Sequence, residues 1–144
     1  TKMLRGRRIA FDYGDVRIGV AISDPDSILA SPLTTLSSGD PKLFAQISEL
    51  ITEHEPIAIY VGDPLNLSGQ SSTSAQKAAA FAQKLHNEFS VPVTMIDERL
   101  STVSATNAMR QSGINAKNAR NKIDMAAAVA ILEQGIAIEK AKDV

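Results

Sequence analysis

The pattern of apolar residues changes once along the chain, and this change limits the folds available to it. Short extended segments fill the first third of the sequence, whereas helical and extended patterns alternate from residue 40 onward. The first part predicts an antiparallel meander with strands at residues 8–12, 17–23 and 30–36. The alternating part predicts parallel strands joined by helical crossovers. Together they favour an α/β fold with a mixed five-stranded sheet flanked by helices.

The elements of the second part are bounded by capping, glycine and proline residues. In order, they are a helix capped by Asp40 and Pro41 and ended by Pro56, a strand at 57–61, a helix at 74–88, a strand at 93–96, a helix from Ser101 or Thr102 to Gly113, and, after a polar loop, a helix at 123–138. This order places the carboxyl ends of the parallel strands at one edge of the sheet, where sites form in open α/β folds.

The composition restricts the chemistry of a site at that edge. The 144 residues include no cysteine, and the two histidines lie far apart in the sequence. A metal site would therefore be built from oxygen ligands. Length and a hydrophobic content of 44% predict one domain over residues 1–144. No apolar run approaches the ~20 residues of a membrane span, and the start lacks a signal-peptide stretch, so we expect a cytoplasmic protein with no membrane partner.

Acidic residues follow three of the predicted strands. Asp12 closes the first strand, Asp63 follows the fourth, and Asp97 and Glu98 close the fifth. Carboxylates at such an edge are suited to hard divalent cations. A pair of Mg²⁺ or Mn²⁺ ions can activate water and stabilise the leaving oxygen when a phosphodiester is cleaved. If Asp12 stood alone, a residue that only starts a turn would be the favoured interpretation.

The adjacent acids Asp97 and Glu98 are more informative than either would be alone. Two neighbouring carboxylates after a buried strand repel each other unless a cation or an arginine compensates them. Because neighbouring strand residues point to opposite faces, we assign Glu98 to the metal site and expect Asp97 to brace the next helix or pair with Arg99. The alternative is that both acids only favour the dipole of the following helix.

Asp124 is expected in the first turn of the last helix. It shares a helical stripe with Ala128 and Ile131, and the small residues at 126–128 would let this helix approach the sheet closely. Asp12, Glu98 and Asp124 are therefore the predicted catalytic and metal-binding residues, with Asp63 and Asp97 as additional candidate ligands. An exposed complement to the helix dipole is the alternative for Asp124.

The net charge of −1 does not suggest a nucleic-acid partner, but the distribution of charge does. One purely basic block precedes Asp12, and another extends from Arg99 to Lys122. The predicted nucleic-acid contacts are Arg17, Asn66, Arg99, Arg110, Lys117, Arg120 and Lys122. Solvated surface charge is the alternative interpretation of these blocks.

Four motifs in the same order resemble the YqgF/RuvX family, whose members are Holliday junction resolvase-like proteins also regarded as nucleases for the 5′ end of pre-16S ribosomal RNA. The motifs are Asp12-Tyr-Gly with Arg17-Ile-Gly-Val-Ala and Asp24, Gly62-x-Pro-Leu-Asn with Gly69, Asp97-Glu-Arg-Leu-Ser-Thr, and Ile123-Asp124 with Ala127-Ala128 and Ile131-Leu132. The resemblance implies a ribonuclease H-like fold, dependence on Mg²⁺ or Mn²⁺, and catalytic acids at Asp12, Glu98 and Asp124. Asp63 departs from the family pattern, in which an apolar or bulky residue is expected.

The predicted function is hydrolysis of phosphodiester bonds in structured RNA or branched DNA by a metal-dependent endonuclease. Processing of the 5′ end of pre-16S rRNA is the first expectation, with ribosomal precursor particles as partners and a monomer or weak homodimer as the working form. Resolution of Holliday junctions is the alternative activity, and a non-catalytic nucleic-acid- or ribosome-binding module is the alternative from another class. Actin-like ATPases share the Asp-x-Gly turn but need two facing domains, for which 144 residues leave no room.

Overall fold

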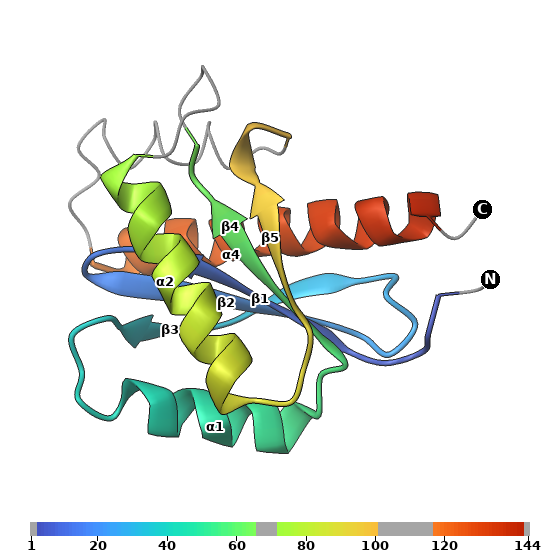
Figure 1. Ribbon diagram of the computed structural model, residues 1–144, viewed down its shortest axis with the longest axis horizontal. Coiled ribbons are helices and arrows are strands. Elements are labelled where there is room, and N and C mark those ends of the chain that lie inside the picture. Colours follow the sequence, from blue (N-terminus) through green and yellow to red (C-terminus); the bar gives the residue numbers. More distant parts are fainter. Residues whose placement is uncertain (1–2, 66–71, 101–116, 143–144) are drawn as a thin grey trace.

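The computed structural model describes residues 3–65, 72–100 and 117–142, and contains one mixed sheet (Figure 1). The elements are β1 (Arg8–Tyr13), β2 (Arg17–Ser23), β3 (Ala30–Ser37), α1 (Leu43–His54), β4 (Ala58–Asp63), α2 (Thr73–Glu88), β5 (Val93–Asp97), the short 3-10 helix η1 (Glu98–Leu100) and α4 (Lys117–Lys142). The strand order is β3-β2-β1-β4-β5. Strands β1, β2 and β3 are antiparallel, and β4 is parallel to both β1 and β5. The predicted meander followed by parallel strands is confirmed.

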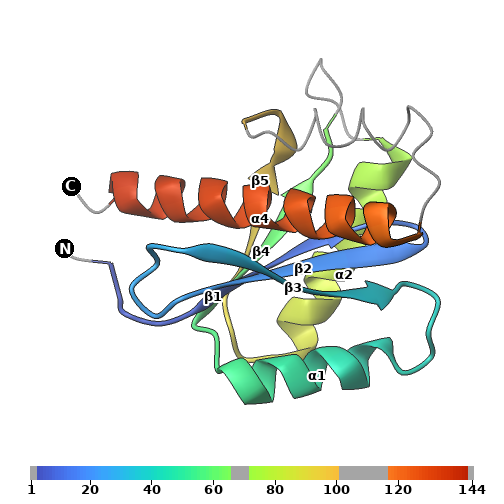
Figure 2. The same cartoon turned by 180° about the vertical axis from the view of Figure 1, so that it is seen from behind.

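Helices cover both faces of the sheet. Helices α1 and α2 lie on one face, and α4 crosses the other (Figures 1 and 2). Alternation along β1 divides its side chains between two cores, because Ile9 and Phe11 pack toward α1 and α2 while Ala10 packs toward α4. Small residues on the α4 side of β1 and β2, namely Ala10, Gly19 and Ala21, let the long helix lie close to these strands.

Helix α1 begins later than its capping sequence predicts. The first helical residue is Leu43, whereas Asp40 and Pro41 were expected at the N-cap and first position. The carboxylate of Asp40 instead accepts the backbone N–H of Lys42 at 2.8 Å, and its carbonyl accepts the N–H of Leu43. Asp40 therefore forms a turn that leads into the helix, and its polar role is kept although the boundary shifts.

Helix α4 begins earlier than predicted, at Lys117 in place of residue 123. Asp124 therefore lies two turns inside the helix, and the expectation that it occupies the first turn was wrong. The polar residues before Ile123 resemble a loop in composition, but lysine, arginine and alanine are good helix formers. The helix predicted at residues 101–113 lies outside the described residues.

The far end of α4 is tied to the start of β1 by a buried arginine. Arg8 donates from Nη2 to Oε2 of Glu139 at 2.6 Å, and the Tyr60 hydroxyl donates to Oε1 of the same carboxylate at 2.5 Å. Arg8 also donates to the Ser27 hydroxyl. Such a network compensates a charge that would be costly to bury alone.

Within the described residues, no helix has the length and apolar character needed to span a membrane.

Candidate active site

Three of the predicted acids are buried on the face of the sheet that α4 covers. Asp12 on β1, Glu98 directly after β5 and Asp124 on α4 are 7%, 5% and 5% exposed. Asp12 alternates with Phe11 on β1 and therefore shares the face of Ala10, which packs against α4. Burying three carboxylates requires compensation by hydrogen bonds or cations. Of the two adjacent acids, Glu98 is buried and Asp97 is half-buried.

Gly19 brings Asp124 close to Asp12. Gly19 is the register partner of Asp12 on β2. A Cβ atom at position 19 would lie 2.0 Å from the carbonyl oxygen of Asp124, so the backbone of α4 rests directly on this strand. Only glycine permits this approach. The sequence motif containing Gly19 was recognised, but its role in seating the helix depends on strand register and was not predicted.

Gly62 on β4, on the other side of Asp12, also permits close packing. Val61 pairs with Phe11, so Gly62 follows at the level of Asp12 on β4. A Cβ atom at position 62 would lie 2.5 Å from Cδ1 of Ile131 on α4 and 3.3 Å from the carboxyl carbon of Glu98. The Glu98 carboxyl group and α4 therefore both pack against Gly62. Asp12 is flanked by two glycines, with the backbone of Asp124 packed against Gly19 and the carboxyl group of Glu98 packed against Gly62.

The chemistry of this donor set is that of a site for hard divalent cations, since all three groups present carboxylate oxygen. Among the described residues, however, no three acidic or histidine side chains form a group tight enough to hold a metal ion. Asp12, Glu98 and Asp124 are thus buried on one face of the sheet beside Gly19 and Gly62, and their role as metal ligands stays a prediction.

Arg17 is held by one of the acids. Its Nε atom lies 2.7 Å from Oδ2 of Asp124, and the two side chains are 29% and 8% exposed. Arg17 has the same strand parity as Gly19, so it points to the α4 face. The contact of Arg17 with phosphate stays a prediction. The structure gives it a further task that the sequence analysis missed, which is to neutralise and orient Asp124.

Asp97 and Asp63 form a separate cluster with Arg99. The backbone N–H and the guanidinium group of Arg99 donate to the Asp97 carboxylate at 2.6 to 3.1 Å, so the expected pairing of Asp97 with Arg99 is observed. Hydrogen bonding from Arg99 lowers the pKa of Asp97. Burial and the charge of Asp97 raise the pKa of Asp63.

This second cluster faces away from the three buried acids. Asp63 and Asp97 are register partners, and each follows a residue of the α4 face, Gly62 and Ile96. Alternation along the strands therefore points both side chains toward the opposite face from Asp12. The structure does not bring Asp63 or Asp97 into the group formed by Asp12, Glu98 and Asp124.

Only some of the remaining predicted nucleic-acid contacts lie among the described residues. Arg99 and Lys122 are exposed, and Arg120 is half-buried. Asn66, Arg110 and the side chain of Lys117 lie outside the described residues. Arg120 and Lys122 belong to the first two turns of α4, the same end of the helix as Asp124.

A family model described as "RuvX: Holliday junction resolvase" matches residues 6–137. The chain belongs to the RuvX family. A Streptomyces avermitilis protein named "Putative pre-16S rRNA nuclease" is 46% identical over 140 residues, which cover 96% of this RuvX chain and 90% of the relative. A relative of the same name from Corynebacterium jeikeium is 46% identical over 131 residues, covering 90% and 84% of the two chains. The family predicted from the four motifs is confirmed.

Solved structures similar to this RuvX protein confirm the ribonuclease H-like fold. Thermus thermophilus RuvC superposes with a TM-score of 0.59 at 15% sequence identity, and the match covers 95% of this chain and 97% of RuvC. The same protein in complex with a Holliday junction substrate gives a TM-score of 0.57 at 15% identity, covering 95% of each chain. At this identity the likeness concerns the fold.

Proposed function

We propose that this RuvX protein is a metal-dependent endonuclease that hydrolyses phosphodiester bonds at the 5′ end of pre-16S rRNA, with structured RNA in ribosomal precursor particles as its partner. The observation that carries this proposal is the burial of Asp12, Glu98 and Asp124 around two glycines on the α4 face. The pre-16S rRNA nucleases named among its relatives support the substrate. Cytoplasmic action as a monomer or weak homodimer, with residues 1–144 as one nuclease domain, is part of the proposal.

Asp12, Glu98 and Asp124 would hold the Mg²⁺ or Mn²⁺ ions. When bound, such a pair supplies an activated water and charge stabilisation for the phosphorane and the leaving oxygen. The protein's own contribution is placement, because carboxylates fixed by packed elements cost less reorganisation than mobile ones. Helix α4 resting on Gly19 fixes the backbone of Asp124, and Arg17 fixes its carboxylate. Gly62 leaves room for the Glu98 carboxyl group next to β4.

The test compares Asp12→Asn with Asp26→Asn in a cleavage assay on a pre-16S rRNA 5′ leader. Asp26 is an exposed acid paired with Arg5, and it provides a matched loss of one negative charge away from the site. Wild type and Asp26→Asn should cleave with Mn²⁺ and lose activity with EDTA. Asp12→Asn should keep the melting temperature within a few degrees and lose cleavage. Wild-type cleavage by purified Asp12→Asn would refute the assignment.

Holliday junction resolution is the second candidate, and the description of the family model favours it. The same proteins are therefore assayed on a four-way DNA junction at equal enzyme concentration. Faster cleavage of the RNA leader supports rRNA processing, whereas symmetric junction cleavage without RNA cleavage would assign the site to resolution. Tight binding of either substrate with no cleavage under any divalent cation would identify a binding module.

A further inference from the structure

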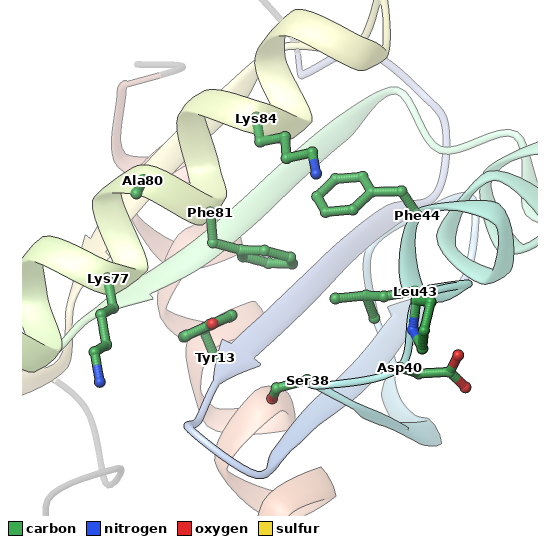
Figure 3. Close-up of a pocket in the computed structure, with 10 residues that line it drawn as sticks. Tyr13, Ser38, Asp40, Leu43, Phe44, Lys77, Ala80, Phe81 and Lys84 are labelled. Carbon is green, nitrogen blue, oxygen red and sulfur yellow. The ribbon is translucent and has the colours of Figure 1, made fainter.

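A cavity of about 490 Å³ lies between α1, α2 and the end of β1, on the face of the sheet opposite α4 (Figure 3). It is outside the group of buried acids. Aromatic, cationic and polar side chains contribute to its wall, including Tyr13, Asp40, Phe44, Lys77, Phe81 and Lys84. Figure 3 shows the rings of Tyr13, Phe44 and Phe81 close together with Lys84 beside Phe44, whereas the Lys77 and Asp40 side chains extend away from the rings.

Three aromatic rings form one side of this cavity. The Phe81 ring is buried, and its centroid lies 4.9 Å from that of Tyr13 and 6.0 Å from that of Phe44. Tyr13 and Phe44 are only half-buried. Phe81 thus fixes two flanking rings that keep part of their surface open to the cavity. Rigid, partly exposed aromatic rings are the groups on which unpaired bases stack.

Two lysines add positive charge at the rim. Nζ of Lys84 lies 4.2 Å from the centroid of the Phe44 ring, and Nζ of Lys77 lies 2.9 Å from the Asp15 carboxylate. Both lysines are exposed, so each ammonium group can turn toward a phosphate at little cost. Asp40 is the acidic member of the wall, and its carboxylate already accepts the Lys42 backbone N–H and the Gln46 side-chain amide.

The cavity adjoins the candidate active site through consecutive residues. Tyr13 directly follows Asp12 on β1, and the two side chains point to opposite faces of the sheet at the same strand end. A nucleic-acid strand with its scissile phosphate at Asp12 can therefore pass over the end of β1 and reach the cavity with a neighbouring nucleotide.

We propose that this cavity binds an unpaired nucleotide of the substrate strand, with its base stacked against Tyr13 and Phe44 and its phosphates near Lys77 and Lys84. The proposal rests on the nuclease function proposed above. It makes the cavity a specificity site, because a fully paired strand cannot insert a base. Substrates with a single-stranded segment beside the cleavage position would be preferred.

The test is a binding measurement that needs no cleavage. Short single-stranded RNA containing 2-aminopurine is titrated with the Asp12→Asn protein in EDTA, and both anisotropy and 2-aminopurine fluorescence are recorded. Ala80→Trp fills the cavity from an exposed position of α2. Ala79→Trp, an exposed neighbour outside the cavity wall, is the matched control. Melting temperatures establish that both variants fold. The assay measures binding without cleavage, so its result can be interpreted even if the protein proves not to be a nuclease.

The expected result is quenching of 2-aminopurine by the parent protein and by Ala79→Trp, and about tenfold weaker binding with no quenching for Ala80→Trp. Lys84→Ala should lower the salt slope of log affinity by about 0.7, the value for one phosphate on a single strand, while Lys142→Ala leaves it unchanged. Equal affinity and equal quenching for the two tryptophan variants would overturn the proposal. A changed salt slope for Lys84→Ala together with unchanged binding by Ala80→Trp would also overturn the proposal. It would mean that Lys84 attracts phosphate while the cavity binds no base.

Discussion

The carbonyl oxygen of Asp124 lies where the side chain of residue 19 would begin, 2.0 Å from an ideal Cβ built on Gly19. The contact joins the backbone of α4 to the strand that pairs with Asp12. Backbone atoms cannot rotate away as a side chain can, so any side chain at position 19 must lift α4 from the sheet.

Gly19→Ala is therefore expected to destabilise the protein by about 3 kcal/mol, at the upper end of overpacking costs. It should also abolish cleavage in the fraction that remains folded, because Asp124 moves away from Asp12. Denaturant unfolding and the RNA cleavage assay measure the two effects. Gly39→Ala is the matched control, since a Cβ there meets no atom within 4 Å and should change neither quantity. Full activity of Gly19→Ala would show that the seating of α4 does not matter for the chemistry.

Arg17→Ala tests the ion pair with Asp124. The pair is largely shielded from solvent, so removal of the guanidinium group should cost about 2 kcal/mol, between surface and buried values. Arg5→Ala removes a comparable contact to Asp26 between side chains that are 72% and 54% exposed, and it should cost less than about 0.5 kcal/mol. A double-mutant cycle of Arg17→Ala with Asp124→Asn isolates the coupling. Additive losses would mean that the pair contributes nothing.

Asp63→Asn tests whether the second acidic cluster belongs to the metal site. Burial and the charge of Asp97 raise the pKa of Asp63 above its ordinary 3.8, so the ionised group destabilises the folded protein. The folded state then binds the proton more tightly, and stability falls as pH rises through the interval above 3.8. Asp63→Asn should raise the melting temperature at neutral pH, lose this gain below 3.8, and retain Mn²⁺-dependent cleavage.

Asp24→Asn should change the melting temperature at neutral pH in the opposite direction from Asp63→Asn. Hydrogen bonds from the backbone N–H groups of Leu29 and Ile28 lower the pKa of Asp24, so its contribution is present above 3.8 and is lost as pH falls through the lowered value. The melting temperature of the variant should be lower than that of wild type at neutral pH, and the difference should shrink in acid.

The contradicting outcome for Asp63→Asn is loss of cleavage in a folded protein. That result would make Asp63 a metal ligand despite the face it occupies.

Local pattern was sufficient to predict the sheet, because alternation and helical spacing are properties of neighbouring residues. It also selected Asp12 and Glu98 at strand ends, and Asp124 on the apolar stripe of the last helix. The contact of Arg17 with Asp124 spans 107 residues, and the tasks of Gly19 and Gly62 depend on register between strands. These relationships exist only after pairing, so no local pattern contains them.

The errors at the helix boundaries have a related cause. Residues 117–122 are polar and were interpreted as a loop, whereas their capacity to continue α4 depends on packing of the apolar residues that follow. The cavity beside Tyr13 was not predicted because its walls come from β1, α1 and α2, whose relative positions the sequence pattern does not specify.

The final prediction concerns Arg8, which ties the far end of α4 to β1. Burial raises the pKa of Glu139, but hydrogen bonds from Arg8 and Tyr60 outweigh it and hold the pKa below 4.5. The stabilisation is therefore present above 4.5 and is lost as pH falls through the lowered value. Arg8→Met should lower the free energy of unfolding by about 3 kcal/mol at neutral pH, and Tyr60→Phe should lower it by about 1 kcal/mol. The free energy of unfolding of Arg8→Met should also depend less on pH in acid than that of wild type.

Cleavage should respond differently from stability in Arg8→Met. Glu139 lies roughly 22 Å along the helix from Asp124, and that distance follows from a rise of 1.5 Å per residue. Gly19 and Arg17 hold the Asp124 end of α4 independently of the Arg8 network. The folded variant should therefore cleave RNA at the wild-type rate below its melting temperature, as measured at an enzyme concentration corrected for the folded fraction. A reduced rate with unchanged Mn²⁺ affinity would show that the two ends of α4 are coupled.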